Sequence, residues 1–581
     1  MTNLIAIANL ALTLVCQNPD GWQFTTSTAS PTQDIWLVTF DLVRDQPAPL
    51  PAFSVKCSVP QIDIQHIWHP MTEHLTLPPN WAGNTYSSFA DGAPIRTLLN
   101  DNNLNRLTLA SSEAARPHHF AIGLVEEDCT IGIAVNYPRG ESEPCRRYRA
   151  VLRFDLRRDA LWSDAIQDAA RWLNTLPGMA PATPPPEAYE PLYSTWYNFH
   201  QDVHAADIEA ECERAAKLGM KVLIVDDGWQ TDDTARGYAY CGDWQVSTNR
   251  FPDFRAHVAR VQALGMKYLI WYSVPFVGFK SQNYARFKGK YLRDDKRQGA
   301  SVLDPRFPEV RDFLASTYEQ AMVKYGLDGF KLDFIDAIYT WHGEPAEKDN
   351  YAGRDCKSIS EALDRLLSDI MARLKRIKPD VLVEFRQRYI GPSIRKYGNM
   401  MRAGDCPGDI LANRVRTTNI RLSSPGSATH ADMLEWNVSE APEQAARQIL
   451  SVLFTVIQYS RTLKDLPPDH VKMLKHWIDF TRAHRETLLH GHFRAFHPQA
   501  NYPMLEAEGE RERIVAVYQS GMAVEVEPSE KETIVVNGTG RGGLRLSYPA
   551  GRPASIQVFD TFGQAVEGET IPSSGYAVVR F

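Results

Sequence analysis

The features that would indicate a nucleic-acid or a membrane partner are missing from this 581-residue sequence. Its 63 Lys and Arg residues and 70 Asp and Glu residues are interspersed, without long runs of one sign, and give a formal net charge of −7. No apolar segment reaches the roughly 20 residues that a membrane-spanning helix needs. We therefore expect no nucleic-acid partner and no membrane partner, whereas a homo-oligomer is compatible with this composition.

Cysteine is sparse and follows no pattern. The eight cysteines are scattered, with no CxxC pair and no Cys/His spacing of a metal site, so we expect neither a metal nor an organic cofactor. The apolar segment LIAIANLALTLVC at residues 4–16 resembles the core of a secretion signal, but the first basic residue is Arg44. Because a signal peptide needs a positively charged start and a small-residue cleavage site, we interpret the segment as sheet and the protein as cytoplasmic.

Two regions of short, alternating apolar segments flank the middle of the chain. Residues 1–185 contain segments such as DIWLVTFDLV and TIGIAVNYP, which are typical of a β-sandwich, and end in a proline-rich linker. Residues 488–581 return to this pattern with RIVAVYQ, ETIVVNGTG and GYAVVRF. They predict a second, smaller β-sandwich domain at the C-terminal side.

The middle region, residues 186–487, has a different pattern of predicted secondary structure. Apolar runs such as KVLIVDDGW, KYLIWYSVPF and LDGFKLDF alternate with longer helical patterns. Repeated strand–helix units predict a parallel sheet, and the length is close to the roughly 250 residues of a (β/α)8 TIM barrel. A doubly wound sheet is the alternative, but no GxGxxG or P-loop motif follows any of these strands.

Charged residues gather where the predicted strands end. Lys331 and Asp333 alternate with apolar residues in GFKLDF, so both point to one face of a strand. Three other strand ends carry similar pairs, which are Asp226–Asp227, Glu384–Arg386 and Arg402–Asp405. Because the active sites of TIM barrels lie at the carboxyl ends of the strands, and buried carboxylates need partners, this set predicts an active site.

Two carboxylates on facing strands are what cleavage of a glycosidic bond requires. One attacks the anomeric carbon, and the other protonates the leaving oxygen. Asp333 is the better nucleophile, because the neighbouring Lys331 ammonium favours its ionised form. Asp405 is the candidate acid, and we expect the negative charge of Asp333 to raise its pKa.

Six stretches of the middle region occur in the order found in clan-D α-galactosidases. They are STWYNFH (194–200), VDDGWQ (225–230), GDWQVSTNRFPDF (242–254), VLDPRFPEVRDFL (302–314), KLD (331–333) and RAGDCPGD (402–409). On these motifs the chain resembles glycoside hydrolase family 36, the melibiase-like α-galactosidases. The most specific part is Lys–x–Asp downstream of Asp–Asp–Gly–Trp, and the flanking β regions also fit the layout of the family.

The resemblance implies a retaining hydrolase that removes terminal α-galactosyl residues from oligosaccharides or other glycosides through a covalent intermediate. It implies Asp333 as the nucleophile and Asp405 as the acid/base, preferred over Asp409 because it comes first after the strand. Asp226 and Asp227 would accept hydrogen bonds from the C4 and C6 hydroxyls of the sugar. The other candidate substrate-binding residues are Lys331, Trp196, Trp229, Trp244, Trp271, Glu384, Arg386, Arg402 and Asp409.

The sequence departs from the family at two strand ends. VEFRQRYIG (383–391) replaces a Cys- and Gly-rich motif that contacts the C2 substituent, so an α-N-acetylgalactosaminidase stays an alternative. YSVPF (272–276) replaces a Glu–Pro–Glu segment. His430 and Asp432, in SATHADMLEW (427–436), lie at a predicted seventh strand end, where a structural hydrogen bond is favoured for His430.

Other functions are also compatible with these residues. A raffinose-synthase-like α-galactosyl transferase would use the same covalent intermediate. A Schiff-base aldolase with Lys331 as nucleophile is disfavoured, because Asp333 beside it would raise the pKa of the lysine instead of lowering it. An inactive sugar-binding protein is disfavoured because both candidate carboxylates are present.

Overall fold

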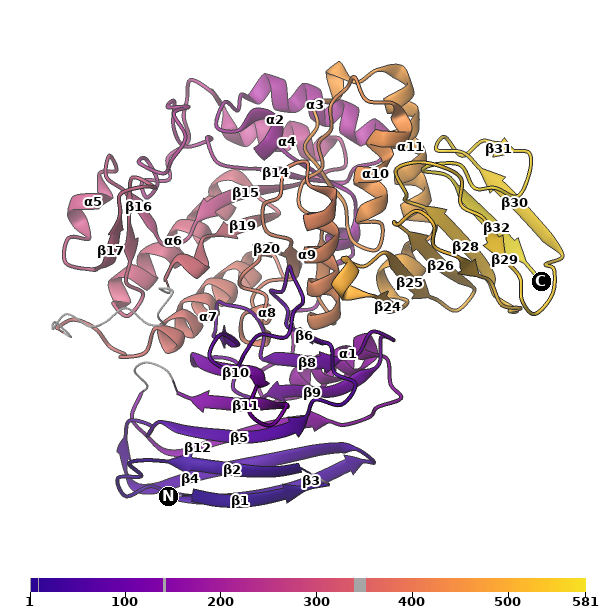
Figure 1. Cartoon of the computed structure of the whole chain (residues 1–581). Helices are drawn as coiled ribbons and strands as arrows, with labels where there is room; N and C mark the ends of the chain where they lie inside the picture. The colour runs from indigo at the N-terminus through magenta and orange to yellow at the C-terminus, as the bar shows by residue number, and fades with distance from the viewer. Residues whose placement is uncertain (1, 9, 139–142, 339–351) are drawn as a thin grey trace.

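The computed structural model describes residues 2–8, 10–138, 143–338 and 352–581 (Figure 1). The N-terminal sheets lie below the central barrel in this view, and the C-terminal sheet lies beside it. Strands of the N-terminal part run from Thr2 to Asp155, those of the barrel from Leu192 to Tyr459, and those of the C-terminal part from His492 to Arg580. The domain limits 1–185, 186–487 and 488–581 stay predictions.

Within its described residues, the N-terminal part is a sandwich of two six-stranded sheets. In order across the first sheet, the strands are β1 (Thr2–Ile7), β2 (Leu10–Cys16), β5 (Phe53–Pro60), β11 (Thr130–Tyr137), β10 (His118–Val125) and β7 (Asn84–Ser87). Those of the second are β3 (Gln23–Thr32), β4 (Ile35–Ala48), β12 (Cys145–Asp155), β9 (Asn105–Ser111), β8 (Ile95–Leu99) and β6 (His66–Trp68). Alternate side chains such as Leu12, Phe40 and Phe120 fill the space between the sheets. Within the apolar segment, residues 4–7 lie in β1 and residues 10–16 form β2, and the two strands pair, so the predicted sheet is confirmed for these residues.

The central part is a barrel of parallel strands. In order around the sheet from the first strand of the chain, they are β13 (Leu192–Ser194), β14 (Val222–Val225), β15 (Lys267–Ser273), β19 (Gly329–Asp333), β20 (Leu382–Arg386), β21 (Met400–Arg402), β22 (Ala428–His430) and β23 (Gln458–Tyr459). Strand β23 pairs with β13, and parallel bridges between His430 and Val456 and between Leu434 and Tyr459 close the circle. The barrel prediction is therefore confirmed, and the doubly wound alternative is wrong.

Helices follow the strands and cover the outside of the barrel. They are α3 (Ala205–Leu218), α4 (Phe254–Ala263), α6 (Pro308–Tyr325), α7 (Ile359–Ile377), α8 (Pro392–Arg395), α9 (Ile410–Ser423), α10 (Pro442–Ser451) and α11 (Pro468–Ala483). Helix α7 shows why they form: the Ser358 side chain caps its start, and Leu363, Leu366, Ile370 and Leu374 recur at helical spacing on its buried face. In the described ranges, no helix has the length and apolar character needed to cross a membrane.

An insertion interrupts the barrel between β15 and α6. It contains β16 (Phe276–Gly278), the short helix α5 (Asn283–Arg286), β17 (Tyr291–Asp295) and β18 (Ala300–Leu303). The three strands form a small antiparallel sheet in the order β16–β18–β17. Because it follows a barrel strand at its carboxyl end, the insertion extends the wall of the barrel mouth.

The C-terminal part, whose residues are all described, is built on a seven-stranded sheet. In order, its strands are β24 (His492–Phe496), β25 (Met504–Glu508), β26 (Glu512–Val517), β28 (Glu532–Asn537), β32 (Tyr576–Arg580), β30 (Ser555–Phe559) and β31 (Ala565–Val566). A two-stranded sheet, β27 (Val524–Glu525) with β29 (Leu546–Ser547), completes the small sandwich. Its core includes Val524, Val535 and Leu544.

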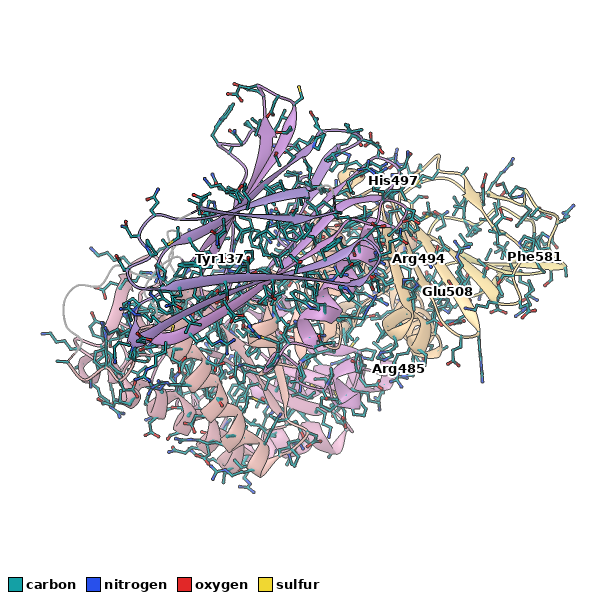
Figure 2. The ribbon with its side chains drawn as sticks, turned by 90° about the horizontal axis from the view of Figure 1, so that it is seen from below. Tyr137, Arg485, Arg494, His497, Glu508 and Phe581 are labelled. Carbon is teal, nitrogen blue, oxygen red and sulfur yellow. The ribbon has the colours of Figure 1, made fainter. Side chains whose placement is uncertain are left out.

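The three parts meet around one tryptophan. Trp68 in β6 is fully buried, and its indole N–H lies 3.1 Å from Asn419 Oδ1 in α9 and 3.0 Å from the Tyr502 hydroxyl. Figure 2 shows His497 at the same junction, where its backbone N–H donates to Asn103 of the N-terminal part. Helix α1 (Trp162–Asn174), predicted from the sequence, packs here against β9 and α9.

We expect Trp68→Phe to lower the free energy of unfolding by about 1–3 kcal/mol, because it removes the indole donor to the buried Tyr502 hydroxyl oxygen and leaves Asn419 Oδ1 with the Tyr502 hydroxyl as its donor. Urea denaturation followed by circular dichroism measures this change. Trp81→Phe, at a side chain that is 64% exposed, is the matched control and should have little effect. Equal stability of the two variants would contradict a linking role for Trp68.

Candidate active site

The predicted strand-end residues converge at the carboxyl end of the barrel. Trp271 in β15 is paired in register with Lys331 in β19, which is paired with Glu384 in β20. Two residues beyond Glu384, and so on the same face of β20, Arg386 is paired with Arg402 in β21. The charged side chains therefore form two adjacent layers at one end of the parallel sheet.

Asp333 is held from both sides of its carboxyl group. Trp271 Nε1 donates to Oδ2 at 3.0 Å, and Arg386 Nε donates to Oδ1 at 2.6 Å. The backbone N–H of Phe334 also donates to Oδ1, at 2.7 Å. Burial alone would raise the pKa of Asp333, but the charges of Arg386 and Lys331 outweigh it and hold the pKa well below its usual range. Asp333 is therefore ionised, as predicted.

Lys331 forms a buried ion pair with the second strand of the barrel. Its Nζ lies 2.5 Å from Asp226 Oδ2, and both side chains are almost completely buried. Burial lowers the pKa of Lys331, but the charges of Asp226, Asp333 and Glu384 together outweigh it and raise the pKa. A permanently charged lysine is a poor Schiff-base nucleophile, which weighs further against an aldolase.

Asp227 has a different environment from its neighbour Asp226. The side-chain amides of Gln201 and Gln230 donate to its two oxygens, each at 2.6 Å. Burial raises the pKa of Asp227 to about 6, because the amides carry no charge to offset it. Neither glutamine was predicted from the sequence as a partner of Asp227. For Gln230, its position directly after the DDGW motif could have indicated this role.

Arg402 binds three carboxylates. It donates to Asp432 Oδ1, and its Nη2 lies 2.8 Å from Asp405 Oδ1. Its Nε lies 3.5 Å from Glu384 Oε1, and the arginine side chain is fully buried. Asp432 also accepts hydrogen bonds from the Tyr197 hydroxyl at 2.7 Å and from the backbone of Cys406 at 2.6 Å.

The expected rise in the pKa of Asp405 is wrong for the free site. Burial and the charge of Asp333 do raise the pKa, but the positive charges of Arg402 and other nearby cations outweigh them, so the pKa is lowered. The side chain of Asp405 remains 53% exposed, at the open end of the barrel. The sequence indicated Arg402 and Asp405 as a pair, but the prediction weighed only the charge of Asp333 and not that of the arginine.

Glu384 lies deeper than a substrate-binding residue is expected to lie. It has no exposed area, and its Oε2 accepts a hydrogen bond from Gln458. Burial raises its pKa to about 7. His430 continues this chain: its Nδ1 lies 3.2 Å from Gln458 Nε2, and its Nε2 lies 2.8 Å from the Ala188 carbonyl. We interpret Glu384 and His430 as supports of the layer above them.

The four candidate tryptophans lie at different depths. Trp271 contacts Asp333 directly, and Trp244 packs on Trp271 with 6.0 Å between the ring centroids. Trp229 is fully buried behind them and donates to the Trp271 backbone carbonyl at 2.9 Å, so we interpret it as a support. Trp196, in α2 (Trp196–Phe199), is half-buried and packs edge-on against His200.

Asp409 has a local structural role. Its Oδ1 accepts hydrogen bonds from the backbone N–H groups of Leu411 and Ala412, at 3.0 and 2.9 Å, which caps the start of α9. Asp405, by contrast, interacts electrostatically with Asp333. This geometry favours Asp405 over Asp409 as the acid/base candidate.

Two residues beside Asp333 were not predicted. The Tyr389 hydroxyl lies 3.0 Å from the Leu332 carbonyl and 3.4 Å from Asp333 Oδ1. Asp336 lies 3.4 Å from Arg386 Nη1, on the far side of the guanidinium from Asp333. Tyr389 belongs to the VEFRQRYIG segment, whose departure from the family pattern was the signal in the sequence.

The fold and these charges define a (β/α)8-barrel protein with a carboxylate site at the carboxyl end of its strands. A family model described as Melibiase matches residues 188–491, more than half of the chain. The chain belongs to the Melibiase family.

Curated relatives match over part of the barrel. The α-galactosidase Mel36A of Lactobacillus acidophilus is 28% identical over 204 residues, which are 33% of this chain and 26% of that protein. The bifunctional α-galactosidase/sucrose kinase AgaSK of Mediterraneibacter gnavus is 29% identical over 204 residues, 33% of this chain and 20% of that protein. The matched segments thus span about a quarter or less of the relatives' own length.

Solved structures share the whole architecture. The α-galactosidase of Lactobacillus brevis superposes with a TM-score of 0.66 at 15% identity, over 100% of this chain and 84% of that one. The family 36 α-galactosidase AgaA of Geobacillus stearothermophilus, solved in complex with stachyose, gives a TM-score of 0.67 at 13% identity, over 98% and 83% of the two chains. At this identity the similarity shows the fold.

We expect Asp409→Ala to lower the free energy of unfolding by about 0.5–2 kcal/mol, because α9 loses its N-cap. Urea denaturation measures the change. Asp409→Asn is the matched control, since an asparagine oxygen caps equally well. Equal losses in the two variants would show that the charge of Asp409, and not its capping oxygen, is what matters.

Proposed function

We propose that this protein is a retaining glycoside hydrolase that removes terminal α-galactosyl residues. The observation that carries the proposal is the asymmetric carboxylate pair: Asp333 is clamped and ionised by Arg386 and Trp271, and Asp405 stands half-exposed at the barrel mouth. Relatives that are named α-galactosidases support the substrate class, as does AgaA, which was solved with stachyose.

In the first step, an oxygen of Asp333 attacks the anomeric carbon. Two strong donors, Arg386 Nε and the Phe334 N–H, hold Oδ1, whereas among the described residues Trp271 is the one donor to Oδ2. Oδ2 keeps more electron density and is the better attacking oxygen. The bond to the leaving oxygen breaks as Asp405 gives that oxygen a proton, so this step requires the protonated form of Asp405, which the nearby cations disfavour in the free site.

In the second step, Asp405 accepts a proton from water, which attacks the anomeric carbon and releases Asp333. Formation of the ester removes the negative charge of Asp333, one of the charges that raise the pKa of Asp405. The pKa of Asp405 therefore falls once the intermediate has formed, which suits its change from acid to base. Two inversions give net retention.

The Asp226–Asp227 pair would select the sugar. Carboxylate oxygens accept hydrogen bonds only, and an epimer that lacks a matching hydroxyl leaves a buried acceptor unpaired. An N-acetylgalactosaminidase and an α-galactosyl transferase stay alternatives, since both would use the same two catalytic carboxylates. The cytoplasmic location and the three domain limits stay proposals that rest on the sequence.

We expect Asp333→Gly to abolish turnover of an aryl α-galactoside, and azide to restore it from the vacated face. Nuclear magnetic resonance should identify the product as the inverted β-galactosyl azide. Asp405→Ala should lower kcat/KM for substrates with poor leaving groups by about 10²–10⁴-fold. Azide should then yield the retained α product, because the ester on Asp333 still forms.

Asp409→Ala serves as the control for this experiment and should show no azide product. The reverse stereochemical outcomes would exchange the roles of Asp333 and Asp405. A retained azide product from Asp409→Ala alone would move the acid/base role to Asp409.

We expect Arg386→Met to shift the acidic limb of the pH–kcat/KM profile upward by about one to three pH units. The nucleophile must be ionised, so activity is lost as the pH falls through the pKa of Asp333. The neighbouring Arg386 charge lowers that pKa, and its removal raises it. Arg388→Met is the matched control, because the Arg388 side chain binds Asp91. An unshifted limb in Arg386→Met would show that the arginine does not set the ionisation of Asp333.

A further inference from the structure

A cavity of about 150 Å³ lies next to the Asp227 side of the site. Its walls are the loop from Gln230 to Cys241 and the turn from Lys296 to Gly299, which joins β17 to β18 in the insertion. Gln201 and Gln230, the two donors to Asp227, also line it. The cavity therefore adjoins the sugar site through the residues that hold Asp227.

Tyr238 provides a second connection between the cavity and the site. It lines the cavity, and its ring stacks on Trp271 with 5.8 Å between the centroids. The charges of Asp227 and Asp333 both contribute to raising the pKa of its hydroxyl, after burial as the main cause. The tyrosine thus lies between the candidate nucleophile and the cavity.

The walls of the cavity carry excess positive charge. Arg236, Lys296 and Arg297 are exposed, and in the described part of the chain none of them forms an ion pair with a carboxylate. Asp233 is the acidic residue among the described wall residues. It is engaged elsewhere, since it lies 3.7 Å from Lys280 and accepts the Ala235 N–H at 2.8 Å.

Arg236, one of the cavity's cations, is held in place by His200, which is not among the described residues lining the cavity. Arg236 Nη2 lies 2.9 Å from His200 Nε2, and an arginine can only donate, so this ring nitrogen accepts and Nδ1 carries the hydrogen. Within the described residues, Nδ1 is buried and has no partner. Burial and the charge of Arg236 lower the pKa of His200, whereas the charge of Asp226 raises it.

The backbone holds this wall in a fixed shape. The Tyr238 N–H donates to the Gln298 carbonyl at 2.8 Å, and the Lys280 N–H donates to the Ala239 carbonyl at 2.9 Å. Gly237 adopts φ 113°, which a side chain would strain, at the point where the loop turns towards Gln298. The three cations are therefore presented on a loop and a turn that brace each other.

We propose that this cavity is a subsite for an anionic substituent, a sulfate ester or a carboxylate, on the terminal sugar. The subsite rests on the proposed function, because it requires a sugar held by Asp226 and Asp227. A neutral sugar would leave the three cations solvated, whereas an anionic group would form charge-assisted hydrogen bonds with them. The cavity has room for several waters, and so for one such group.

The experiment compares 4-nitrophenyl α-galactosides that are neutral or carry one sulfate at O3, O4 or O6, together with the α-galacturonoside. We expect one anionic substrate to exceed the neutral one in kcat/KM by about tenfold or more, through a lower KM. In the double variant Arg236→Gln/Arg297→Gln this ratio should fall to near one. Which substrate is preferred separates a sulfate subsite from a carboxylate subsite.

Lys288→Gln is the matched control, because it removes an exposed positive charge from the same insertion but outside the cavity. It should keep the ratio of the unmodified protein. The ratio should also fall as the ionic strength rises, since exposed charges are screened. The proposal is overturned if no anionic substrate exceeds the neutral one, or if the double variant keeps the ratio.

Failure of the proposed function would look different: neither the neutral nor any anionic galactoside would be hydrolysed. In that case calorimetry with methyl α-galactoside and its O3-, O4- and O6-sulfated forms and with methyl α-galacturonoside tests the subsite directly. Binding of an anionic form at least tenfold tighter than the neutral form, lost in the double variant, supports the subsite. Equal affinities, or a preference that the double variant keeps, overturn it.

Discussion

Arg402 is the residue on which the arrangement of the site depends. It is buried in β21 and contacts three carboxylates, those of Glu384, Asp405 and Asp432, from β20, its own loop and the end of β22. Unpaired buried charges destabilise a protein by several kcal/mol, so a barrel can hold this many acids only if cations share the layer. Lys331 has the same role for Asp226 on the opposite side.

This charge balance also divides the chemistry between the carboxyl groups. Asp333, beside Arg386, has a strongly lowered pKa, whereas Asp227, bound only by amides, has its pKa raised to about 6. The nature of the nearest partner, charged or neutral, therefore decides the direction of the pKa shift, since both side chains are buried. The same rule applies to Asp405: the charge of the adjacent Arg402 and other cations lowers its pKa more than the charge of Asp333 raises it.

The parts outside the barrel reach the rim of the site. Glu73 of the N-terminal part pairs with Arg416, which in turn donates to the backbone carbonyl of Asp405 at 2.7 Å. Asp91, from the same part, pairs with Arg388 on the loop after β20. The N-terminal sandwich thus braces two loops of the barrel mouth. The insertion after β15 forms part of the wall of the cavity on the Asp227 side of the site.

Much of this could be predicted from residues close together in the sequence. The alternation of strands and helices predicts the barrel, and the pairs at strand ends predict which end carries the site, because parallel strands present their carboxyl ends together. The spacing of Lys331 and Asp333 predicts their shared face. The hydrogen-bond partners of these residues were harder to predict, because Gln201 and Gln458 lie in no motif that marks them.

The sequence by itself therefore determined the fold and the family and predicted which strand ends carry carboxylates, since these follow from local periodicity and from motifs in a fixed order. The tertiary structure alone decided which cation faces which acid. It made the charges of Arg402 and other cations outweigh that of Asp333 at Asp405, so that a pKa expected to rise is lowered, engaged Asp409 as a helix cap, and buried Glu384 and Trp229 behind the site. The physical reason is that electrostatic energy depends on distances of a few ångströms between residues far apart in the chain, which sequence order does not specify.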